Sequence, residues 1–157
     1  MTQSYQWRRQ YIALVEDIFR ELGFAPPEMT HDPDLPLAME LELEGATFEI
    51  VHSPGEHPQQ ILVECRFGTP PREREAAVLA RLLEVNLELA RAHQAAYGID
   101  AATGEVIHAF RQALDQAGAR ALLETMKQIA VQAAQWRDTH FLDGAPAPQA
   151  PGFEVLA

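Results

Sequence analysis

Two groups of polar residues in this chain have the types that metal binding would need. His52 and His57 flank a Pro-Gly turn that also contains Glu56, and His31 is followed by Asp32 and Asp34. Histidine nitrogens and carboxylate oxygens are common ligands of zinc and other divalent metals. Neither group has the spacing of a metal motif such as H-E-x-x-H or C-x-x-C. We therefore interpret both as solvated loops and predict no metal site.

A set of glutamates resembles the paired carboxylates with which glycoside hydrolases work, one as acid and one as base or nucleophile. They alternate with apolar residues, which is typical of the solvated face of a strand; the set is Glu40, Glu42, Glu44 and Glu49. Ser4 and Ser53 are the only serines, and no G-x-S-x-G, P-loop or G-x-G-x-x-G motif occurs. We predict that the protein has no catalytic residues, is not an enzyme and binds no cofactor.

Composition narrows the function further. The chain has 157 residues and a formal net charge of −11, which argues against nucleic acid and anionic membranes as partners. The single cysteine, Cys65, alternates with apolar residues and is interpreted as a buried strand residue in a reducing compartment. The first residues lack an uninterrupted apolar run, and no segment has the length of a membrane span. We predict a cytoplasmic protein.

The hydrophobic pattern predicts an α+β fold with the order α-β-β-β-α-β-β-α, in which helices pack on a twisted antiparallel sheet. A helical period over residues 4–22 ends at Gly23. A period of two predicts three strands at 37–44, 48–52 and 60–67. A second helix should begin with Thr69 as N-cap and Pro70 in its first turn, and should run to about residue 93. A hairpin at 95–111 around Gly104 and a helix at about 115–139 complete the order.

The second helix carries more apolar surface than one core requires. Its apolar residues span well over half of a helical wheel, whereas a helix that covers one core normally needs a stripe of about 100°. We predict that a second copy of the chain covers the excess. A helix sandwiched between the sheet and the last helix is the alternative. Asn86, inside this arc, would bond either across a two-fold axis or to the backbone of a neighbouring strand. The predicted dimer interface comprises Val78, Leu79, Leu82, Val85, Asn86 and Leu89.

With these elements in place, the chain resembles the class I type III secretion chaperones, the Tir chaperone (CesT-like) group. The resemblance covers roughly residues 5–140. It is carried by the order of elements and by three motifs, LLEVNL at 82–87, YGID at 97–100 and TGEVI at 103–107. Members of that family tend to have a Leu-Leu-x-x-Asn helix, a Gly-x-Asp strand, and a glycine turn that leads into an apolar strand.

The resemblance implies a homodimer formed through the second helix and the fourth strand. It also implies a partner, the N-terminal segment of a secreted effector, which wraps around the dimer in extended form and adds a strand to a sheet edge. The family's grooves involve the first helix and the sheet. The residues that this analogy assigns to effector binding are Trp7, Tyr11, Leu14, Ile18, Leu41 and Leu62. Membership of the chain's own hydrophobic core is the alternative for each of them.

Two further expectations concern function and domain organisation. A regulatory or adaptor protein of the same fold, without a secretion client, is the main alternative to a chaperone, and a small hydrolase or metal-binding enzyme is the third possibility. Residues 1–142 are expected to form a single domain. Residues 143–157 are rich in proline, alanine and glycine, and are expected to form a flexible tail.

Overall fold

The computed structural model describes residues 3–29, 32–55, 57–92 and 94–142. The helices and strands follow one another in the predicted order, with two short 3-10 turns added. They are α1 (Gln3–Glu21), β1 (Leu37–Leu43), β2 (Ala46–His52), β3 (Gln60–Gly68), η1 (Arg72–Arg74), α2 (Glu75–Ala92), β4 (Ala95–Ile99), β5 (Val106–Ala113), η2 (Leu114–Gln116) and α3 (Ala119–Thr139). The α+β prediction is confirmed. The predicted tail, 143–157, lies outside the described residues.

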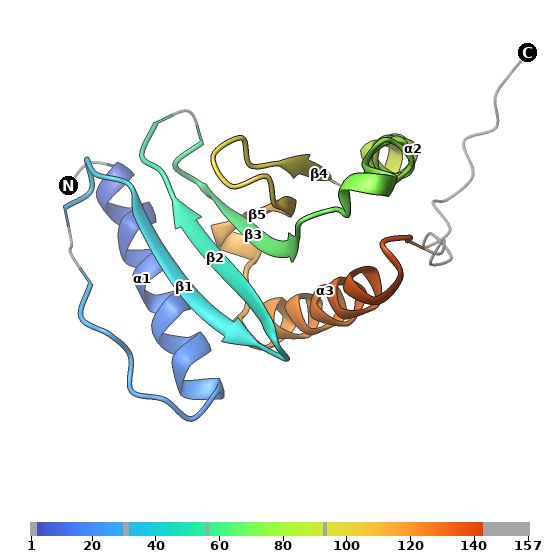
Figure 1. The fold of residues 1–157 in the computed structure, drawn as a ribbon. Helices are drawn as coiled ribbons and strands as arrows, with labels where there is room; N and C mark the ends of the chain where they lie inside the picture. The colour runs from blue at the N-terminus through green and yellow to red at the C-terminus, as the bar shows by residue number, and fades with distance from the viewer. Residues whose placement is uncertain (1–2, 30–31, 56, 93, 143–157) are drawn as a thin grey trace, which may run out of the picture.

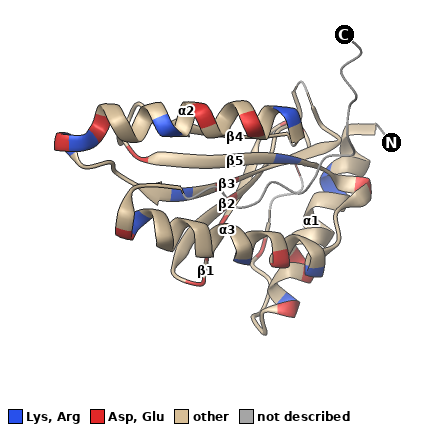
Figure 2. Cartoon of the chain, turned by 90° about the vertical axis from the view of Figure 1, so that its right-hand side faces the viewer, with Lys and Arg blue, Asp and Glu red and all other residues tan. Residues whose placement is uncertain are grey.

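The five strands form one antiparallel sheet in the order β1-β2-β3-β5-β4. Helices α1 and α3 lie on one face of the sheet, and the opposite face carries none of the described helices (Figure 1). Helix α2 lies lengthwise along β4, at one edge of the sheet (Figure 2). Strand β1 forms the other edge. This arrangement leaves three features for partners: a sheet face, the edge at β1, and the outer side of α2.

The hydrophobic core lies between the sheet and the helices α1 and α3. Side chains of β2 and β3 alternate between buried and half-buried or exposed, as a strand with one covered face requires. Phe48 and Phe67 from the sheet are fully buried, as are Tyr11 of α1 and Trp136 of α3. Cys65 is also buried, as predicted, and burial raises the pKa of its thiol to about 12.

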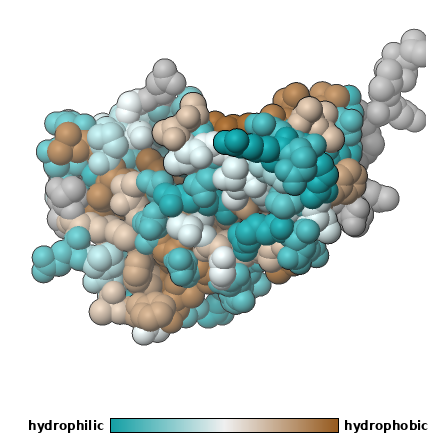
Figure 3. Space-filling view, in the orientation of Figure 1, coloured by the Kyte–Doolittle hydropathy of each residue, from teal (hydrophilic) through white to brown (hydrophobic). Residues whose placement is uncertain are grey.

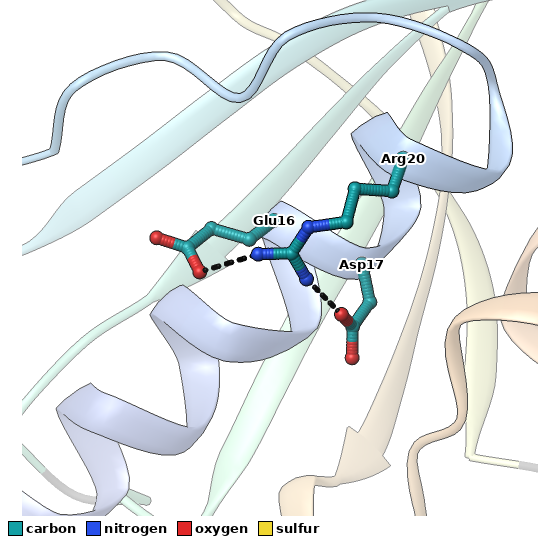
Figure 4. Close-up of polar contacts among 3 residues, drawn as sticks. All are labelled: Glu16, Asp17 and Arg20. Carbon is teal, nitrogen blue, oxygen red and sulfur yellow. Dashed lines mark hydrogen bonds and ion pairs between the residues drawn. The ribbon is translucent and has the colours of Figure 1, made fainter.

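The solvent-facing side of α1 carries a small ion-pair network. Arg20 donates to a carboxylate oxygen of Glu16 at 3.2 Å and to one of Asp17 (Figure 4). Exposed pairs at such helical spacing contribute only about 0.3–0.5 kcal/mol each. The helix then ends at Gly23, whose φ of 80° lies in the left-handed region, as predicted.

The start of the second helix differs from the prediction. Thr69 does not cap it; instead Pro71 precedes the turn η1 in an extended conformation, and the α-helix begins only at Glu75. A residue that precedes proline is disfavoured in the α region. Pro70 precedes Pro71, so it cannot comfortably occupy the first turn of a helix.

Candidate protein-binding surfaces

The predicted dimer residues lie on the side of α2 that faces the body of the chain. Val78 and Leu82 are buried, and three others are half-buried against the core: Leu79, Val85 and Leu89. This side packs along β4, to which α2 makes most of its tertiary contacts. Part of the apolar arc of α2 is therefore buried within the chain itself.

A second apolar stripe on α2 is exposed. Leu83 and Leu87 are 69% and 56% exposed. Ala76, Ala80 and Ala90 continue the line along the helix and are exposed as well. The successive separations of four, three, four and three residues match the seam by which two helices pack together. Apolar surface is visible where α2 lies, at the upper right of Figure 3. Sequence periodicity gave one wide arc, whereas the structure separates it into a covered side and an uncovered one.

Asn86 closes the sheet edge at β4. Its amide nitrogen donates to the carbonyl oxygen of Tyr97 at 2.9 Å, and its amide oxygen accepts from the Tyr97 N–H at 2.7 Å. A neighbouring strand would make the same pair of bonds. Of the two predicted roles for Asn86, the structure shows the bond to a neighbouring strand's backbone. Its side chain, together with α2, occupies the position at which another strand would pair with β4.

The edge at β1 is open in the part of the chain that the structure describes. Strand β1 pairs with β2 from Leu37 to Leu43, and no backbone hydrogen bond joins its other edge to a described segment. Its side chains separate cleanly by face. Glu40 and Glu42 are exposed on the uncovered face, whereas Leu41 and Leu43 are buried toward the helices. An unpaired edge of this kind is a template for pairing with another chain.

Most of the residues assigned to effector binding belong to the core of the chain. Tyr11, Leu14, Ile18 and Leu41 are buried. The Tyr11 hydroxyl donates to the carbonyl oxygen of Ile50 at 2.7 Å. Only two of the six assigned side chains are accessible: Trp7 and Leu62, both half-buried. Trp7 packs at the margin of the core on α1, whereas Leu62 lies on the uncovered face of the sheet.

A buried polar node at the end of the sheet was not predicted. Arg8 is fully buried, and its Nε donates to Nδ1 of His52 at 3.1 Å. Its other nitrogens donate to two carbonyl oxygens of the α1–β1 connection, that of Asp32 at 2.8 Å and that of Leu35. His52 Nε2 lies 2.8 Å from the carbonyl oxygen of Pro58. The three bonds of Arg8 link segments that are distant in the sequence.

The interpretation of His52 as part of a solvated turn is therefore wrong. It ends a strand on the covered face, where burial and the nearby Arg8 lower its pKa despite the hydrogen bond to Pro58. Burial also lowers the pKa of Arg8. His57 is exposed, as predicted, and His31 and Glu56 lie outside the described residues. Within the described ranges no three potential ligands come together to hold a metal ion, and no helix is both long and apolar enough to span a bilayer.

The uncovered sheet face contains a shallow hollow of about 450 Å³ over β3, β5 and β4. Its floor includes Ile107 and Ala109, and Glu49, Glu64 and Asp100 stand among its walls. Burial, with Glu49 and Asp100 nearby, raises the pKa of Glu64, although Arg66 opposes the shift. The groups around the hollow have no arrangement of nucleophile, base and orienting residue.

Comparison with solved structures shows the same fold in three complexes. A chain of the ExsC–ExsE complex matches with a TM-score of 0.63 and 14% identity, over 87% of this chain and 97% of that one. A chain of the HopA1–SchA chaperone–effector complex gives 0.60 and 16%, over 84% and 96%. A chain of the ExoT–SpcS complex from Pseudomonas aeruginosa gives 0.55 and 20%, over 80% and 95%.

None of the curated proteins matches the chain significantly. The family model of the Tir chaperone proteins, however, matches residues 14–137, which include every described strand, all of α2, nearly all of α3 and the second part of α1. It spans the exposed stripe of α2, the sealed edge at β4 and the open edge at β1. The chain belongs to the Tir chaperone protein (CesT) family.

Proposed function

We propose that this protein is a cytoplasmic, non-catalytic type III secretion chaperone, which binds the N-terminal region of a secreted effector as a homodimer and keeps it competent for secretion. Membership of the Tir chaperone family is the observation that supports this most strongly. Two uncovered features of the fold are consistent with it: an apolar helix stripe suited to a second copy and an open sheet edge suited to an extended client.

The dimer contact that we propose is the exposed stripe of α2. In a monomer, Leu83 and Leu87 stand largely in water. Complete burial of one leucine side chain contributes roughly 1.5–3 kcal/mol, so two copies of both leucines make a substantial contact. Because a two-fold axis brings the same patch together from both copies, the stripe needs only to be complementary to itself. The residues first predicted for the interface would then support the stripe from the covered side.

A charge placed on the stripe tests the dimer. Leu83→Glu should convert the dimer to a monomer, because the carboxylate would be buried against an apolar partner. Val131→Glu is the matched control, since Val131 is 55% exposed on α3, away from the stripe. Light scattering coupled to size exclusion at micromolar concentration gives the mass. Leu82→Glu and Val85→Glu would also perturb the contact between α2 and β4 within one chain. A loss of the dimer in these variants would therefore not distinguish a broken interface from a misfolded protomer. A monomeric wild type would contradict the proposed dimer.

The client site that we propose comprises the β1 edge together with apolar surface on α1 and the sheet. Main-chain hydrogen bonds would give affinity to an added strand, and apolar burial would hold the remaining segment. The edge at β4 is a poor alternative because Asn86 and α2 cover it. Since neither main-chain bonds nor apolar burial depends strongly on ionic strength, most of the affinity should persist at high salt.

Client binding is tested by comparing the wild type with Leu62→Asp in pull-downs from the native cell. Leu62 is half-buried on the uncovered face of β3, so a carboxylate there should weaken client retention and leave the dimer intact. Quantitative mass spectrometry of the retained proteins provides the measurement, and the mass of the variant checks its assembly. Absence of any secreted protein from the wild-type sample would favour an adaptor role.

A further inference from the structure

A row of glutamates crosses the uncovered sheet face and ends at the open edge. Glu40 of β1 is directly opposite Glu49 of β2, and Glu49 is directly opposite Glu64 of β3. Like charges in directly opposed positions destabilise a sheet. Among the described residues, one cation pairs with this row: Arg66 donates to a carboxylate oxygen of Glu40 at 3.2 Å. The row therefore retains an excess of negative charge, and Glu42 adds to it two residues along β1.

The open edge of β1 is where the row would continue. Neighbouring strands lie about 4.8 Å apart, so a strand added to β1 brings one residue opposite Glu40 and another opposite Glu42. Both glutamates are exposed on the same face. Acidic residues in these two client positions would extend the repulsion, whereas lysine or arginine would form cross-strand ion pairs.

The other face of an added strand meets apolar surface. Leu37 and Met39 of β1 are half-buried and pack against the core, and so are Trp7 and Phe19 of α1. Helix α1 lies beside β1 on that face of the sheet (Figure 1). Successive residues of a strand point to opposite faces, so the client residues between the basic ones should be apolar.

A second copy of the chain fits this edge poorly. If two β1 strands paired with each other, glutamates of both copies would lie on the same side of the joined sheet, close to one another. Acidic edge residues of this kind commonly prevent edge-to-edge pairing of identical chains.

We propose that the β1 edge selects a client strand in which lysine or arginine, facing Glu40 and Glu42, alternates with apolar residues, facing α1. This inference rests on the proposed chaperone function and specifies the chemistry of the client. The glutamates thus have two effects: they oppose self-pairing, and they favour a basic amphipathic strand.

The test uses three capped eight-residue peptides in which valine alternates with lysine, glutamate or serine. Each is titrated into the isotopically labelled full chain, and backbone amide shifts give both the site and the affinity. At low salt the lysine peptide should bind at β1 about tenfold more tightly than the glutamate peptide, as two modest cross-strand pairs would produce. This ratio should fall toward one in 0.5 M salt, since exposed charges are screened, while the serine peptide changes little.

Two double variants separate local recognition from net charge. Glu40→Lys with Glu42→Lys should reverse the preference to the glutamate peptide. Glu73→Lys with Glu88→Lys changes the net charge equally, but at exposed positions in and near α2, and should keep the preference for lysine. Equal affinities, a preference that follows net charge alone, shifts centred away from β1, or no binding of any peptide would each overturn the inference. If a secreted client is retained while the peptides show no preference, this inference fails and the chaperone function stands.

Discussion

Replacing Asn86 with alanine should destabilise the protein by about 2–3 kcal/mol. The amide makes two hydrogen bonds to the backbone of Tyr97, at 2.9 and 2.7 Å, and each neutral bond contributes about 1 kcal/mol. Its loss also leaves two backbone groups of β4 partly buried without partners, which costs about 1 kcal/mol more, at the low end of the range for buried groups. The higher helix propensity of alanine offsets about 0.5 kcal/mol.

Thermal and urea unfolding measure this effect, at fixed protein concentration because the proposed dimerisation would contribute to stability. The midpoint should fall by roughly 4–12 °C for a chain of this size. Asn86→Asp should also destabilise, because a carboxylate keeps the acceptor for the Tyr97 N–H but faces the Tyr97 carbonyl oxygen with another acceptor. Glu88→Ala, an exposed change on the same helix, should have little effect.

Hydrogen exchange identifies the bond itself. The Tyr97 amide should exchange much faster in Asn86→Ala than in the wild type, while the central strands β2 and β3 keep their protection. A free energy of unfolding within about 0.5 kcal/mol of the wild type, together with an unchanged Tyr97 amide, would refute the view that Asn86 closes the β4 edge.

Three other predictions follow from the buried groups and the tail. Burial lowers the pKa of His108 to about 4 from an unfolded value of 6.5, so the folded state binds fewer protons than the unfolded state. The free energy of unfolding should therefore be highest above pH 6.5 and lower by about 2 kcal/mol at pH 5. Urea unfolding of the wild type and of His108→Phe at both pH values measures this effect, and a difference between them that does not change with pH would contradict it. Arg8→Lys should destabilise the protein by about 3 kcal/mol in the same assay, because an ammonium group cannot donate at once to His52, Asp32 and Leu35 as the guanidinium does. A variant as stable as the wild type would refute a structural role for these three hydrogen bonds. Truncation after Asp143 should leave the thermal midpoint nearly unchanged, since it spares the Leu142 carbonyl oxygen that accepts from Arg81, and a large fall would mean that the tail packs on the body.

The elements were predictable because their signals are local. A period of two marks β1 to β3, and glycines at 23 and 104 adopt the positive φ that their turns require. The Pro70-Pro71 pair also indicates the late start of α2, because a residue before proline is disfavoured in the α region.

The surfaces were harder to predict because their signals are not local. Periodicity placed Tyr11, Leu14 and Ile18 on an apolar face, but it cannot distinguish a face buried in the chain's own core from one left for a partner. On α2 it merged the side that meets β4 with the side that carries Leu83 and Leu87. The Arg8–His52 bond joins residues 44 apart in the sequence, and only the folded arrangement brings them together.

A secretion assay tests the chaperone function most directly. The gene for this chain would be deleted from its native cell, type III secretion induced, and the secreted proteins quantified by mass spectrometry. At least one secreted protein should be lost from the medium, and it should be restored by the wild-type chain but less by Leu62→Asp. An unchanged set of secreted proteins would contradict the proposed function and leave the adaptor role as the alternative.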